Sequence, residues 1–340
     1  MCKMQANTTV LRGTPKYLTD IKKISLGREP LDFLQLNLEP ICNYRCPKCF
    51  TGMQKKQKAI SSNPLKFNEI APLLEKTMKM GAKVLAISGE GEPLLDQEFR
   101  KIVHFAHTIG LTPFIATNGS LLDEDTVAFL VGNGAAITIS VDTLNQEQYE
   151  NRCGIKSSFD RLMKNIETVR HLFKSTQTEE AGHTIMRCGI HTIIDSQSEK
   201  DIRQLIEFCR NDFHFSIGTV AEGVNNDLKK TSDLSALLSL LGNLSEPLLI
   251  TKTETGKEVC GFFYYGLSIG FDGQILLDAH ATESSGLLGN IRDMSIEDAV
   301  KIARTAVHRC VEQMPDTYCI VRSRNYYNTL ESLKSRGGRK

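Results

Sequence analysis

The first two thirds of the chain alternate between short apolar runs and segments with helical spacing. Apolar positions at intervals of three and four predict one buried face on helices within 67–78, 99–109 and 162–173. The intervening runs are rich in β-branched and aromatic residues and predict six strands, at 33–39, 83–88, 112–117, 135–141, 183–194 and 214–220. This alternation predicts an α/β fold with a parallel sheet, since parallel neighbours need crossover connections.

Periodicity alone leaves a doubly wound sheet and a barrel both open. The unusual residues fall where strands end. A cysteine cluster follows the first strand, Gly-Glu-Gly-Glu-Pro (89–93) follows the second, and Thr-Asn-Gly (117–119) follows the third. Ser140 and Asp142 close the fourth strand. Such placement is typical of the carboxyl edge of a barrel, where active sites are assembled from the βα loops.

The alternation lapses in the last third of the chain. We expect a helix at 234–244, a hairpin at 266–278 that turns at Asp272-Gly273, and a helix opened by a capping box of Ser295 and Asp298. The expected organisation is an N-terminal extension (1–32), a barrel core (33–230), a C-terminal region (231–330) and a flexible tail (331–340).

Composition narrows the class of protein. The 340 residues carry a net charge of +1, so no strong field favours nucleic acid as a partner. Every apolar run is far shorter than the roughly 18 residues that span a bilayer, and the N-terminus shows no secretory signal. A cytoplasmic protein is therefore expected. In a reducing compartment, its ten cysteines favour metal or redox roles over disulfides.

Cys42, Cys46 and Cys49 form a C-x3-C-x2-C cluster directly after the first strand. A structural zinc site usually takes its fourth ligand from a second pair nearby, but the next cysteine is Cys153. Three thiolates on a 4Fe-4S cluster leave one iron free for an exogenous ligand. The spacing therefore favours a cluster over zinc.

Together with the loops after strands two to four, this cluster resembles the radical S-adenosylmethionine (SAM) superfamily over residues 33 to about 221. The resemblance implies a partial (β/α)6 TIM-type barrel and a 4Fe-4S cluster on the three cysteines. The free iron of that cluster would bind SAM. A reductant such as flavodoxin or ferredoxin would then drive cleavage to a 5′-deoxyadenosyl radical, which abstracts hydrogen from a substrate.

The resemblance also implies roles for single residues. Gly89, Glu90, Gly91 and Glu92 correspond to the stretch that meets the methionyl amino group, although Glu90 stands where glycine is frequent. Asn118 and Ser140 occupy positions that commonly reach the ribose, and Arg152 would hold the methionyl carboxylate. The alternatives are that Asn118 only stabilises a turn and that Arg152 is an ordinary surface residue.

The C-terminal region is similar to the twitch and SPASM extensions, which hold auxiliary clusters. The expected auxiliary 4Fe-4S ligands are Cys260, Asp278, Cys310 and Cys319, with Asp278 where the pattern has cysteine. His280 is a rival ligand, and an extension that has lost its cluster is the alternative.

Other candidates are expected at the barrel edge. Cys153 is a possible hydrogen donor to a substrate radical, with core packing as the alternative. Asp142 and His191 are polar candidates, and Arg187 shares one face of the fifth strand with His191. Packing is the expected role of Cys188 and Cys209.

The resemblance implies hydrogen abstraction from a polar small molecule such as a sugar, an aminocyclitol or a nucleoside. The expected reaction is oxidation of an alcohol, with the auxiliary cluster accepting an electron, or an epimerisation. Radical modification of a ribosomally made peptide and a noncatalytic iron-sulfur electron carrier are the alternatives.

Overall fold

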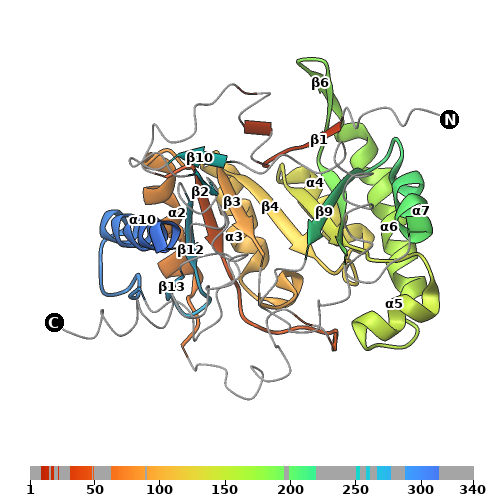
Figure 1. Cartoon of the computed structure of the whole chain (residues 1–340), viewed down its shortest axis with the longest axis horizontal. Coiled ribbons are helices and arrows are strands. Elements are labelled where there is room, and N and C mark those ends of the chain that lie inside the picture. Colours follow the sequence, from red (N-terminus) through yellow and green to blue (C-terminus); the bar gives the residue numbers. More distant parts are fainter. Residues whose placement is uncertain are drawn as a thin grey trace.

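A curved and mostly parallel sheet with helices along one side forms the centre of the molecule (Figure 1). The computed structural model describes residues 9–14, 17–18, 22, 31–47, 49, 63–88, 90–194, 199–219, 250–252, 258–260, 266–276 and 288–313. The sheet order is β13-β12-β2-β3-β4-β5-β8-β9. The strands are β2 (Phe33–Leu36), β3 (Val84–Ile87), β4 (Thr112–Thr117), β5 (Ala136–Ser140), β8 (Cys188–Ile194), β9 (His214–Thr219), β12 (Gly266–Ile269) and β13 (Ile275–Leu276).

The six strands from β2 to β9 in this order are all parallel, as the sequence predicts. Among the described strands the order has two ends, β13 and β9, so these strands do not form a closed barrel. The fold is therefore the α/β partial TIM-type barrel that the sequence predicts. The carboxyl ends of its strands meet at one edge.

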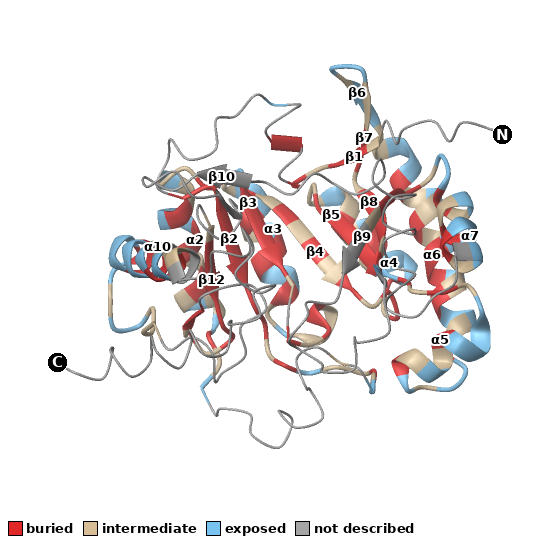
Figure 2. Cartoon of the chain, viewed as in Figure 1, coloured by how far each residue is buried: buried red, intermediate tan, exposed pale blue. Residues whose placement is uncertain are grey.

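The described helices lie mostly along the outer face of the sheet. They are α2 (Phe67–Lys79), α3 (Phe99–Thr108), α4 (Glu124–Gly132), α5 (Gln146–Cys153), α6 (Phe159–Phe173), α7 (Glu199–Cys209) and α10 (Ile296–Gln313), with short 3-10 helices η2 (Pro93–Leu95) and η3 (Lys174–Thr176). The predicted stripes of α2, α3 and α6 face the sheet and are largely buried, while their other faces are exposed (Figure 2). None of the described helices is long and apolar enough to cross a bilayer.

The run predicted as one strand at 183–194 is two strands, which corrects the prediction. β7 (His183–Met186) pairs with β1 (Thr9–Leu11) and β6 (Thr178–Glu180) in a separate small sheet, and only β8 joins the barrel. Arg187 lies between β7 and β8, and its guanidinium donates to the carbonyl oxygens of Leu130, Val131 and Ala135. Arg187 therefore satisfies carbonyls at the end of α4 and does not share the site-facing role predicted beside His191.

The predicted C-terminal hairpin and capping box are both present. β12 and β13 are antiparallel around Asp272-Gly273, where Gly273 has a φ of +87°. Ser295 accepts a hydrogen bond from the backbone of Asp298 at 3.1 Å at the start of α10. β12 also pairs parallel with β2, so the hairpin extends the barrel sheet.

Elsewhere in the C-terminal region, β10 (Ile250–Lys252) and β11 (Glu258–Cys260) form a separate pair. The helix predicted at 234–244 and the tail lie outside the described residues.

The inner face of the sheet changes character along the strands. At the amino ends it is apolar, with Phe33 and Val84 packed against side chains of the N-terminal segment, Val10, Tyr17 and Leu18. Toward the carboxyl ends it carries Thr138, Ser140, His191 and Ser216. The barrel therefore has an apolar base at the amino ends of its strands and a polar mouth at their carboxyl ends.

Candidate active site at the carboxyl edge of the barrel

The three cysteines lie in the loop after β2, half-buried and close together. The backbone N–H of Cys49 donates to the carbonyl of Cys46 at 3.0 Å. Burial, together with the neighbouring thiols of Cys49 and Cys42, raises the pKa of Cys46 to about 12. Burial likewise raises the pKa of Cys42. Thiolates at these positions therefore need a positive charge beside them, which a metal centre supplies.

The surroundings of Cys42 fit an iron-sulfur cluster. Its Sγ accepts hydrogen bonds from the backbone N–H of Tyr44 at 3.4 Å and from the side-chain amide of Asn118 at 3.9 Å. Such N–H···S bonds are the contacts by which proteins tune cluster thiolates. Within the described ranges, no three His, Cys, Asp or Glu side chains converge on one ion. A four-iron cluster takes one thiolate per iron, so its ligands need not converge on a point.

The Gly-Glu-Gly-Glu-Pro segment docks on the start of this loop. The N–H of Glu92 donates to the carbonyl of Ile41 at 2.7 Å. A β-carbon on Gly91 would lie 2.7 Å from the nitrogen of Ile41 and 3.0 Å from the carbonyl oxygen of Glu39. Glycine is therefore required at position 91 by backbone contact with the cysteine loop. Glu90 is buried, and Gly89 lies outside the described residues.

Glu92 connects this segment to the loop after β4. Its buried carboxylate accepts hydrogen bonds from the hydroxyl of Thr117 and the backbone N–H of Asn118, both at 2.7 Å. Burial raises the pKa of Glu92 to about 7, against the lowering effect of these donors. The same carboxyl group therefore positions two of the predicted site loops.

A tyrosine pair that the sequence analysis missed fixes the cysteine loop to α5. The hydroxyls of Tyr44 and Tyr149 are 3.1 Å apart, with the rings edge to face. Burial raises the pKa of Tyr44 to about 12 and raises that of Tyr149 as well. The backbone N–H of Arg45 also donates to the carbonyl of Cys153 at 2.8 Å. The position of Tyr44 inside the cysteine motif was the only available signal in the sequence.

Asp142 and Arg152 lie together beyond the end of β5. Their side chains form an ion pair of 3.5 Å between Oδ2 and Nη1. The other carboxylate oxygen of Asp142 accepts from the backbone N–H of Ile193 at 2.9 Å and the hydroxyl of Thr192 at 3.3 Å. The structure thus brings two predicted residues together and ties them to the end of β8.

Ser140, His191 and Ser216 occupy one row across three strands. Ser140 pairs in register with His191, which pairs with Ser216. Nδ1 of His191 lies 3.0 Å from the hydroxyl oxygen of Ser216. Side chains at paired positions of parallel strands project from the same face of the sheet. This row therefore forms part of the polar wall at the mouth.

Cys153 is 4% exposed and belongs to the main hydrophobic core. Its Sγ lies 3.0 Å from the hydroxyl oxygen of Ser158 and 3.5 Å from the carbonyl oxygen of Ile155. This arrangement favours packing, the alternative to hydrogen donation. Cys188 and Cys209 are also buried in the core, as predicted.

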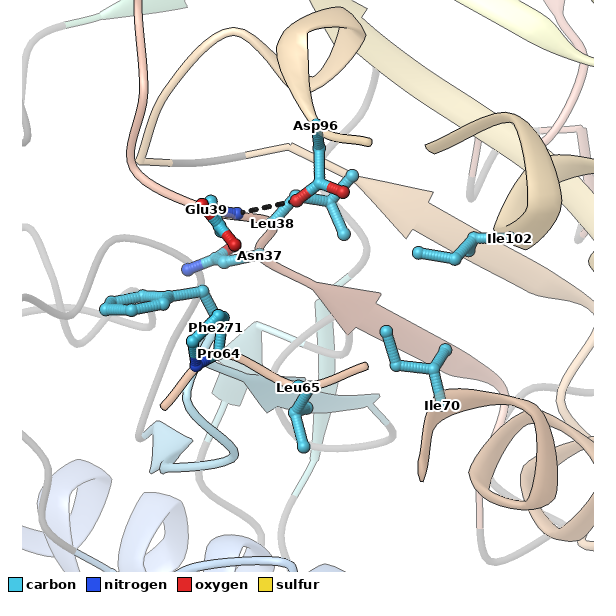
Figure 3. Close-up of a pocket in the computed structure, with 9 residues that line it drawn as sticks. All are labelled: Asn37, Leu38, Glu39, Pro64, Leu65, Ile70, Asp96, Ile102 and Phe271. Carbon is cyan, nitrogen blue, oxygen red and sulfur yellow. Dashed lines mark hydrogen bonds between the residues drawn. The ribbon is translucent and has the colours of Figure 1, made fainter. Parts of the chain in front are cut away.

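A small cavity lies beside the entry to the cysteine loop (Figure 3). Its volume of about 10 Å³ is roughly enough for one water molecule. Asp96 borders the cavity and accepts a hydrogen bond from the N–H of Glu39 at 3.1 Å. Asn37 also lines the cavity, and its buried Nδ2 has no partner among the described residues. The cavity therefore suits an ordered water and is too small for a substrate.

The predicted auxiliary ligands cannot be placed around one centre. Cys260 ends β11 and Cys310 lies in α10, but their side chains lie outside the described part of the structure. Asp278, Cys319 and the rival His280 also lie outside the described residues. The auxiliary cluster stays a prediction.

Comparison with known families identifies the class of protein. Residues 36–209 match the family described as the radical SAM superfamily. The chain belongs to this superfamily. The matched stretch begins at the end of β2 and ends with α7, so it includes the cysteine loop and the two loops docked on it.

Curated relatives match parts of this sequence. The chain is 26% identical over 221 residues to a GTP 3′,8-cyclase of Aliarcobacter butzleri and 28% identical over 130 residues to an AdoMet-dependent heme synthase of Methanosarcina barkeri. The matches cover 59% and 38% of this chain, and 61% and 36% of the length of those relatives.

Two solved structures are similar in fold. SuiB of Streptococcus suis, bound to its precursor peptide SuiA, matches with a TM-score of 0.60 at 18% identity, over 84% of this chain and 66% of that one. The protein anSMEcpe, bound to AdoMet and a peptide, matches with a TM-score of 0.59 at 16% identity, over 89% and 96%. At these identities the likeness concerns the fold alone.

Proposed function

We propose that the protein uses SAM to abstract hydrogen from a polar small molecule of the sugar, aminocyclitol or nucleoside class. The observation that carries this proposal is the docking of the segments at Glu92 and Asn118 directly on the cysteine loop, at the carboxyl edge of the barrel. A 4Fe-4S cluster with bound SAM supplies the reducing electron and the 5′-deoxyadenosyl radical that this chemistry needs.

The residues of this chain would hold and orient those groups. Cys42, Cys46 and Cys49 would hold the cluster, and the segment from Gly89 to Glu92 would face the methionyl amino group. Ser140 would face the ribose. Arg152 would hold the methionyl carboxylate in place of its present partner, Asp142, because a guanidinium binds either carboxylate in the same way.

The polar wall supports the choice of substrate class. Ser140, His191 and Ser216 offer hydroxyl and imidazole groups, which suit hydroxylated compounds. We propose oxidation of an alcohol, in which one hydrogen atom goes to the deoxyadenosyl radical. The substrate radical would then have to lose a proton and one electron, and an auxiliary cluster, which Cys260, Asp278, Cys310 and Cys319 would hold, would supply the electron acceptor. Epimerisation is the redox-neutral variant.

A second candidate is modification of a ribosomally made peptide, kept open by the fold shared with two peptide-bound proteins. Membership of the superfamily counts against a noncatalytic electron carrier. The test is air-free reconstitution with iron and sulfide, followed by dithionite and SAM. We expect 5′-deoxyadenosine, and its absence would contradict the proposal.

The substrate is tested with panels of sugars, aminocyclitols, nucleosides and peptides. Loss of two hydrogens by mass indicates oxidation, and an unchanged mass with an inverted centre indicates epimerisation. Turnover of peptides alone would favour the second candidate.

A further inference from the structure

Asn118 sits in a closed ring of hydrogen bonds between the β4 loop and the cysteine loop. Its Nδ2 donates to Oδ1 of Asn43 at 2.9 Å, and Nδ2 of Asn43 donates to the hydroxyl of Ser120 at 2.7 Å. The backbone N–H of Ser120 donates to Oδ1 of Asn118 at 2.8 Å. Because a backbone N–H can only donate, this last bond fixes which side of the amide is oxygen.

The fixed amide turns its nitrogen toward a predicted cluster ligand. Nδ2 of Asn118 lies 3.9 Å from Sγ of Cys42, which also accepts from the N–H of Tyr44. The backbone of Asn118 is held separately, by its hydrogen bond to the buried carboxylate of Glu92. Asn118 is therefore anchored through both its main chain and its side chain, with one N–H directed at sulfur.

We propose that Asn118 is a positioning residue that raises the reduction potential of the cluster, by donating its side-chain N–H to the thiolate of Cys42. One-electron reduction places additional negative charge on the cluster and its thiolates. A donor beside the sulfur stabilises that reduced form more than the oxidised form. The inference rests on the proposed function, since it requires a cluster on the three cysteines. It assigns both polar atoms of the amide to contacts within the chain, in place of the predicted ribose contact.

The test compares two asparagines of the same ring in the reconstituted full chain, without SAM. Asn118→Ala removes the donor to sulfur, whereas Asn43→Ala breaks the ring but leaves that donor in place. In a redox titration followed by EPR, Asn118→Ala should shift the midpoint to a more negative value. At a fixed potential near the midpoint, its ratio of reduced to oxidised cluster should fall on the order of fivefold. Asn43→Ala should keep the wild-type midpoint.

Equal shifts in both variants would mean that the ring only positions the loop, and they would overturn the inference. Unchanged midpoints in both would also overturn it. Should Asn118→Ala lose its cluster, pulsed EPR on the reduced wild type with ¹⁵N-labelled asparagine tests the same contact. A nitrogen coupling that persists in Asn43→Ala supports the inference, and no coupling refutes it. Wild-type protein without a 4Fe-4S cluster, or without 5′-deoxyadenosine formation, would instead refute the proposed function.

Discussion

Gly91 lies against the peptide of Ile41 so closely that a β-carbon on the glycine would stand 2.7 Å from the nitrogen of that peptide. The contact joins the segment after β3 to the first residues of the cysteine loop. The two loops can therefore dock only while position 91 carries no side chain.

Gly91→Ala should accordingly lower the free energy of unfolding by about 1–3 kcal/mol, as overpacking does. Iron bound after reconstitution should fall with it. Gly132→Ala is the matched control, because an added β-carbon at Gly132 meets no atom within 4 Å and the residue ends a helix. Its unfolding free energy should be unchanged or slightly higher. Equal stability of the two variants in urea would contradict the docking argument.

Tyr149→Phe should leave the hydroxyl of Tyr44 buried without its partner, at a cost of about 1–3 kcal/mol in the metal-free protein. Removing both hydroxyls, in Tyr44→Phe with Tyr149→Phe, should cost less than the sum of the single changes. Chemical unfolding of the four proteins gives the coupling energy. Strictly additive losses would show that the hydroxyl contact contributes nothing.

Glu92 predicts a pH dependence of stability. Its pKa in the folded protein, raised to about 7 by burial, lies above the ordinary 4.5. Between these values the folded state holds a proton that the unfolded state has released, so stability falls as pH rises. The slope is at most about 1.4 kcal/mol per pH unit for one proton. Glu92→Gln should flatten it, and the exposed control Glu124→Gln should not. Urea unfolding of metal-free protein across this range measures both slopes.

Replacing any one of Cys42, Cys46 and Cys49 by alanine should abolish 5′-deoxyadenosine formation and sharply reduce bound iron. Cys209→Ala is the control, since Cys209 ends α7 and is buried in the core. It should lose some stability and keep the wild-type absorbance of the cluster. If a variant that lacks all three of these cysteines kept its full iron content, the metal would have to bind at another site.

Cys153→Ala should retain product formation from any substrate that the wild type accepts, because the thiol is packed among Ser158 and Ile155. The variant should unfold at a lower temperature. Loss of epimerised product, with 5′-deoxyadenosine still formed and the fold intact by circular dichroism, would restore Cys153 as the hydrogen donor.

Local patterns were sufficient to predict most of the strands and helices that make up the barrel. The stripe that includes Ile70 and Leu74 has the period of a helix, and the run at 112–117 is a strand in the structure as predicted. The prediction of one strand at 183–194 was wrong. Two consecutive β-rich strands give one continuous run in the sequence, even when they join different sheets. Arg187 turns away from the barrel because its guanidinium donates hydrogen bonds to carbonyls at the end of α4, and only the tertiary structure shows this contact.

The sequence by itself determined the cysteine spacing, the strand order along the chain and the loops that carry polar residues, because these depend on neighbours close in the chain. Only the tertiary structure decided that Gly91 touches Ile41, that Tyr44 meets Tyr149 and that the amide of Asn118 faces Cys42. Those pairs are separated by some 50 to 105 residues. Packing of four loops at one edge, rather than any local preference, brings them into contact.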